Sequence, residues 1–212
     1  MRPASIVLCL AVAASAGIVD RIAITVGRDV ITELQLDEEL RVTAFLNHRP
    51  IARDNSARHA AADRLIQQLI VRREMEVSRY PLPDAEDVTK YFDQIRGGFA
   101  EAVQFEQALA AYSLTDEILR DHLALQLTTL RFIEFRFQPE VNVTDAEIRS
   151  AYLREVANWK AEHSGAVAPS FDASRESIRK ALAEERIDRA LDAWLQARLR
   201  REHIVYMDTS VR

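Results

Sequence analysis

Hydrophobic and polar residues alternate near the start of the chain, and this alternation predicts a half-buried β-strand. Ile22, Ile24 and Val26 fall on one face at the two-residue period of a strand. Gly27-Arg28 separates this run from a second apolar pair, Val30-Ile31, and a glycine in first place suits a two-residue type II′ turn. We therefore predict a β-hairpin in this stretch.

A helix over residues 34–46 is predicted to follow the hairpin directly. The hydroxyl of Thr32 can accept from the backbone N–H of Gln35, while the glutamine side chain can accept from the N–H of Thr32. The run Asp37-Glu38-Glu39 is expected on the solvated face of this helix. Three adjacent carboxylates on a helix point in different directions, so a metal site is disfavoured there.

The remaining pattern predicts six more helices and one short strand. Helical spacing of apolar residues, capping residues such as Asp84 and Thr144, and the breaker Gly97-Gly98 set their approximate bounds. The helices are expected over residues 58–79, 84–97, 99–111, 115–137, 145–159 and 174–201, with an extended linker over 139–143, a loop over 160–170 and a strand over 203–208. The fold class is therefore mainly α with a small β-sheet, in which the C-terminal strand pairs with the N-terminal hairpin.

The helix over residues 115–137 is apolar on two sides, so it needs two partners. One interpretation is a central core helix packed between neighbours. The other is that one side lines a groove that is open to an extended apolar polypeptide. The first side carries Leu119, Leu123, Leu127 or Gln126, Leu130, Ile133 and Phe137, and the second carries Ile118, Leu125, Phe132 and Phe135.

Composition supports a helical, soluble class and disfavours a nucleic-acid partner. The 212 residues are 48% hydrophobic and include only five glycines and six prolines, which suits helices better than a sandwich or barrel. The net charge is -5, whereas nucleic-acid binding depends on an excess of lysine and arginine.

The first residues have the pattern of a secretion signal. A basic start precedes a short apolar run over residues 6–14, and Ala14-Ser15-Ala16 fits the small-x-small cleavage pattern. We expect cleavage after Ala16, a periplasmic or otherwise secreted protein, and no stable membrane insertion afterwards. Cys9 lies inside the expected signal, so the mature chain would have no thiol chemistry.

No catalytic or metal-binding motif is recognisable. The five histidines lie in different predicted elements, without the spacing that puts two ligands on one helix face. There is no nucleophile elbow, phosphate-binding glycine loop or dinucleotide fingerprint. We therefore expect no enzyme, no metal and no cofactor.

Three stretches carry a resemblance to a known family. The opening over residues 19–36 resembles the start of mature SurA-type periplasmic chaperones, whose relatives include PrsA-like and PpiD-like foldases. The segment Val141-Asn142-Val143-Thr144-Asp145-Ala146-Glu147-Ile148 is similar to the joint that leads into the parvulin-type isomerase domain of such proteins, but only a short loop follows here. The helix containing Trp194-Leu195 resembles the C-terminal helix of the family.

The resemblance implies a SurA N-terminal-like chaperone domain that lacks the isomerase. Residues 1–16 would be the signal peptide, 17–160 the helical chaperone module, 161–173 the linker where relatives carry the parvulin domain, and 174–212 the helix and strand that complete the module. The implied function is an ATP-independent holdase that binds unfolded or extended polypeptides such as outer-membrane protein precursors. The expected client-binding residues are Phe92, Phe99, Phe105, Tyr112, Phe132 and Phe135.

Two other functions stay open. One is a peptidyl-prolyl cis-trans isomerase, which the missing parvulin segment disfavours. The other is a non-catalytic adaptor with one fixed protein partner. Association into a homodimer is also left open by the sequence.

Overall fold

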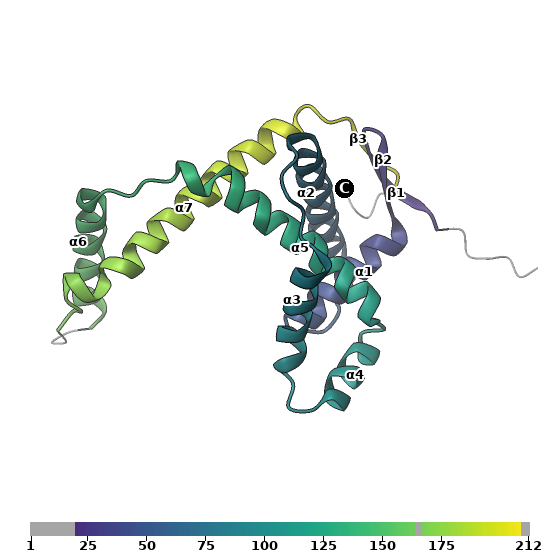
Figure 1. Ribbon diagram of the computed structural model, residues 1–212, viewed down its shortest axis with the longest axis horizontal. Coiled ribbons are helices and arrows are strands. Elements are labelled where there is room, and N and C mark those ends of the chain that lie inside the picture. Colours follow the sequence, from purple (N-terminus) through teal and green to yellow (C-terminus); the bar gives the residue numbers. More distant parts are fainter. Residues whose placement is uncertain (1–19, 164–166, 209–212) are drawn as a thin grey trace, which may run out of the picture.

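The computed structural model describes residues 20–163 and 167–208. In this part of the chain, helices and a small antiparallel sheet confirm the predicted mainly α fold (Figure 1). The expected signal peptide, residues 1–16, lies outside the described residues. The strands are β1 (Ile22–Val26), β2 (Asp29–Thr32) and β3 (Ile204–Tyr206). The helices are α1 (Glu33–Leu46), α2 (Asn55–Ser78), α3 (Ala85–Gly97), α4 (Ala102–Ala111), α5 (Asp116–Arg136), the short 3-10 helix η1 (Gln138–Glu140), α6 (Asp145–Glu162) and α7 (Phe171–Leu199).

The sheet has the order β2-β1-β3, with both pairings antiparallel. The predicted hairpin is confirmed, and Gly27 has a φ of 61° while Arg28 keeps a negative φ, as a type II′ turn requires. The predicted pairing of the C-terminal strand is also confirmed, because Ile24 lies opposite Tyr206 and Val26 lies opposite Ile204. Segments nearly two hundred residues apart therefore share one sheet.

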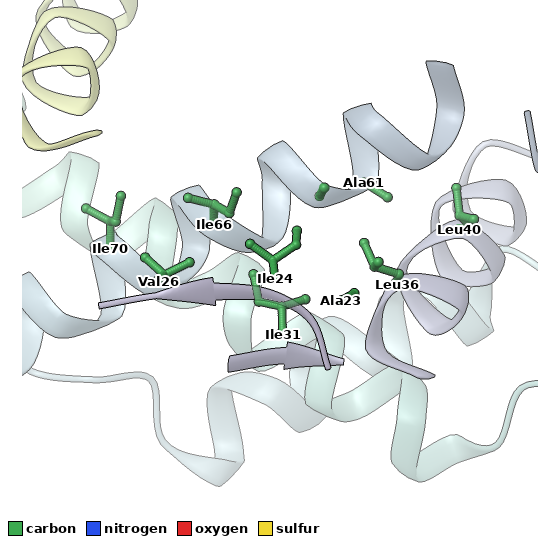
Figure 2. Close-up of a cluster of buried hydrophobic side chains, with 10 residues drawn as sticks. Ala23, Ile24, Val26, Ile31, Leu36, Leu40, Ala61, Ile66 and Ile70 are labelled. Carbon is green, nitrogen blue, oxygen red and sulfur yellow. The ribbon is translucent and has the colours of Figure 1, made fainter. Parts of the chain in front are cut away.

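One face of this sheet is buried against α2 and α1. Figure 2 shows Ile66 and Ile70 of α2 above Ile24 and Val26 of β1. Leu36 and Leu40 of α1 complete the same cluster. Full burial of such a side chain contributes roughly 1.5–3 kcal/mol, so these contacts are the main attachment of the sheet.

Two arginines of α2 fix the ends of the sheet. Arg73 donates from Nε to Asp29 Oδ2 at 2.6 Å and from Nη1 to Glu202 Oε2 at 3.2 Å, which joins the hairpin turn to the segment before β3. Arg58 donates to Glu33 Oε2 at 2.7 Å and to Asp208 Oδ2 at 2.6 Å. Ion pairs thus reinforce the apolar contacts at both ends of the sheet.

Helices α6 and α7 form an antiparallel arm that extends to one side of the body (Figure 1). Within the described residues, the buried part of its own core is small and consists of Ile148, Ala151 and Ile178. The predicted capping box of Thr144 with Glu147 begins α6. Both helices are longer than predicted, since α6 continues to Glu162 and α7 begins at Phe171. Helical residues therefore occupy both ends of the expected 161–173 linker.

Other boundaries differ for local reasons. Helix α4 begins at Ala102 instead of residue 99, because the preceding segment turns after Gly97-Gly98. Pro139 and Glu140, expected to begin an extended linker, form the 3-10 turn η1 together with Gln138, and Pro139 occupies a position that needs no N–H donor.

Helix α5 packs against α1, α2 and α3, so it is a central core helix. The two predicted sides are buried in different parts of the helix. Leu119 and Leu123 of the first side pack in the cluster with α1 and α3, whereas Phe132 of the second side packs in the cluster with α2 and α7 near the end of the helix. Leu130 of the first side is 55% exposed.

Candidate functional site

Two clefts lie beside the contact between α2 and α5, on different sides of these helices. We call the one between α2, α3, α5 and α7 the glutamine cleft, and the one between α1, α2, α5 and the Leu82-Pro83 segment the acidic cleft. The glutamine cleft lies where α7 returns from the arm to the body.

The glutamine cleft has a volume of about 370 Å³ and a largely apolar lining. Its apolar side chains come from four helices and are Val71, Tyr91, Leu130, Leu191 and Leu195. The oxygens Oε1 of Gln68 and Gln126 are shielded from solvent and accept no hydrogen bond. A shielded polar atom without a partner costs about 1–3 kcal/mol, so both oxygens have an unmet demand for an N–H donor.

These features fit a ligand that carries both apolar groups and N–H donors. An extended polypeptide has both, because its side chains can fill the apolar lining while its backbone N–H groups stay available. Gln68 and Gln126 lie on separate helices, α2 and α5, so one chain passing between them could reach both. An extended polypeptide is therefore one kind of ligand whose groups would match this lining, whatever its sequence.

The acidic cleft is larger, at about 670 Å³. Its apolar lining includes Val42, Leu65, Ile118 and Leu125. Its carboxylates are Glu38 and Glu39 of α1 and Glu117 and Asp121 of α5, while its basic side chains are Arg72 and His122. The negative charge of the lining therefore exceeds the positive charge.

Glu39 corrects the expectation that all three adjacent carboxylates face solvent. It is 3% exposed and contacts residues of three helices. Its Oε1 accepts from Arg64 Nε of α2 at 2.6 Å and from Thr43 Oγ1 of α1 at 3.1 Å. Its Oε2 accepts no well-aligned hydrogen bond, but Nδ1 of His122 on α5 lies 3.1 Å away. The last contact is thus an ion pair of imperfect geometry, present when the imidazole is protonated.

Opposing effects determine the pKa of Glu39. Burial raises the pKa most strongly, but the close contact with His122 and then the hydrogen bond and charge of Arg64 outweigh that, so the pKa lies below its ordinary value. Glu39 is therefore a buried anion with partners on two neighbouring helices. One of these partners lines each cleft, since Arg64 lines the glutamine cleft and His122 lines the acidic cleft.

The six aromatic residues expected to bind clients fall into three places. Phe92, Phe99, Phe105 and Tyr112 gather around Phe45 in the cluster that attaches α3 and α4 to α1 and α5. Phe92 and Phe105 are buried there, with ring centroids 5.5 Å apart.

The other two predicted aromatics lie farther along α5. Phe132 is buried between Phe137 and Trp194. Phe135 is 40% exposed and stacks on Tyr80, with centroids 5.9 Å apart. Three of the six are thus core residues in this structure, and Phe135 is the most accessible.

Sequence analysis missed Glu39, His122 and Gln68 as residues of interest. A signal was present, because Glu39 lies three residues after Leu36 and three before Val42, and His122 lies three after Leu119, and these three apolar residues are buried. Polar residues inside an apolar helical stripe are candidates for buried contacts. Their partners on other helices could not be read from this spacing.

Neither a family model nor a curated protein matches this chain. In the described residues, no group of three or more histidine, cysteine, aspartate or glutamate side chains has the arrangement of a metal site. None of the helices over 20–163 and 167–208 is long and apolar enough to cross a membrane.

Proposed function

We propose that this protein is an ATP-independent chaperone that holds unfolded or extended polypeptides, with the glutamine cleft as a client-binding site. The observation that carries the proposal is the combination of an apolar lining with two shielded glutamine oxygens that lack donors. Backbone N–H groups occur in every client, so this chemistry suits binding of many sequences.

The position of the cleft supports the same function. It lies at the base of the α6–α7 arm, beside the exposed Leu130. An arm with a small core of its own can adjust to clients of different shape, because few buried contacts fix it. Clients such as outer-membrane protein precursors are part of this proposal, as is action in the periplasm. The proposal includes no catalytic step.

The test measures light scattering as a diluted, unfolded β-barrel protein aggregates. Near-stoichiometric wild-type protein is expected to delay aggregation. Leu130→Glu should weaken this protection because it places a charge in the apolar lining. Leu153→Glu is the matched control, because Leu153 is 62% exposed on α6 and is not part of the cleft. No delay with the wild-type protein, or equal loss in both variants, would contradict the proposal.

Gln126→Leu separates binding from folding. Replacing a shielded oxygen without a partner by an apolar group should leave the free energy of unfolding unchanged or slightly higher. Peptide affinity should fall about fivefold, since one hydrogen bond contributes roughly 1 kcal/mol. A variant that is less stable and binds as well as the wild type would show that the amide serves the fold alone.

A further inference from the structure

We propose that the acidic cleft binds a basic side chain, arginine or lysine, of an extended polypeptide. This inference rests on the proposed function, since it adds a charge preference to client binding. The two amide oxygens of the glutamine cleft provide no such preference, because they can accept from the backbone N–H groups of any sequence.

The lining of the acidic cleft matches an arginine or lysine in both of its parts. Val42, Leu65 and Ile118 can contact the hydrocarbon stem, while the carboxylates of Glu38 and Asp121 can contact the charged head. Leu82 and Pro83 extend the apolar wall to neighbouring residues of a client.

Three of the four carboxylates of this cleft have no cationic partner at close range among the described residues. Among the residues that the structure describes, Glu38, Glu117 and Asp121 take part in no ion pair within 4 Å, whereas Arg72 of the same lining is paired with Glu76. Burial raises the pKa of Glu38, Arg41 opposes this, and the carboxylate of Asp121 raises it further. A bound cation would relieve this repulsion.

The buried Glu39 of the same lining is paired within the protein. Arg64 donates to its Oε1 at 2.6 Å, and His122 Nδ1 lies 3.1 Å from its Oε2. The attraction for a cation therefore comes from Glu38, Glu117 and Asp121, which lie beside apolar side chains of the cleft.

The experiment compares two short fluorescent peptides by anisotropy at low ionic strength. They are identical except for a central arginine or its neutral isostere citrulline. Wild-type protein is expected to bind the arginine peptide about fivefold more tightly, as one partly exposed charge pair of ~1 kcal/mol implies. The double variant Glu38→Gln/Asp121→Asn should bind both peptides equally. The control Glu86→Gln/Glu176→Gln changes the net charge equally at exposed carboxylates outside the cleft and should keep the preference.

The outcomes separate this inference from the proposed function. Equal binding of both peptides to the wild type would overturn the basic-residue site while leaving the holdase proposal standing, and absence of all binding would overturn both. Competition by free arginine amide as strong as by the arginine peptide would show a small-molecule site and overturn the polypeptide assignment. If circular dichroism shows the double variant to be unfolded, the single variant Asp121→Asn replaces it, and an unchanged preference there overturns the inference.

Discussion

Replacing His122 with leucine tests the buried charge network directly. Glu39 Oε2 has the imidazole as its close neighbour at 3.1 Å, so this change leaves a shielded carboxylate oxygen without a partner. Removing one partner of a buried ion pair costs about 3–5 kcal/mol. Oε1 keeps its bond from Arg64 at 2.6 Å, and the arginine is 39% exposed, so part of the charge stays compensated. We therefore expect a loss of about 2 kcal/mol in the free energy of unfolding.

The assay is urea unfolding, followed by circular dichroism, of the wild type, His122→Leu, Glu39→Met and the double variant. Glu39→Met keeps the length of the side chain and removes its charge. The double variant should lie within about 1 kcal/mol of the wild type, because replacing both partners with apolar groups avoids an orphaned charge. Losses that simply add in the double variant, or a His122→Leu protein as stable as the wild type at mildly acidic pH, would refute the reasoning.

Three further predictions concern the sheet and the response to acid. Truncation after Glu202 removes β3, and with it the packing of Ile204 and Tyr206 and the Arg58–Asp208 ion pair. Thermal unfolding of the truncated protein should therefore occur at a clearly lower temperature. An unchanged melting temperature would show that β3 is not needed for stability. Gly27→Ala places a Cβ at a φ of 61° and 3.2 Å from Glu202 Oε2, and should cost about 1 kcal/mol in chemical unfolding, whereas Gly97→Ala has open space at Cβ and serves as the control. Because the pKa of Glu39 in the folded protein is lowered from 4.5, ionisation of Glu39 stabilises the fold above pH 4.5. This stabilisation is lost as the pH falls through the pKa of the folded protein. Glu39→Gln should therefore show a shallower decline in stability below pH 4.5 than the wild type, and parallel curves would contradict this.

Local chemistry explains why so much of the fold could be predicted. The glycine at 27 and the capping box of Thr32 with Gln35 act over a few residues, and each has the predicted role in the structure. Of the alternating residues, Ile24 and Val26 are buried as predicted, whereas Ile22 is 48% exposed because the register shifts between it and Ile24. The pairing of β3 could be predicted because an isolated hairpin is only marginally stable and the sequence predicts just one further strand.

The candidate sites depended on contacts between helices, which no local pattern specifies. The spacing of Phe92, Phe105 and Phe132 indicated apolar faces, but α3, α4 and α7 decided that these rings are covered.

The sequence by itself determined the elements: the hairpin, the capped helices and the mainly α class, because capping, turn geometry and hydrophobic period are properties of neighbouring residues. The tertiary structure decided which polar groups are buried and what they meet. Glu39 is a buried anion because α2 brings Arg64 and α5 brings His122 to α1. The side-chain oxygens of Gln68 and Gln126 are shielded from solvent because α2 and α5 come together beside α7. Burial and pairing are relations between distant segments, so only the folded chain sets them.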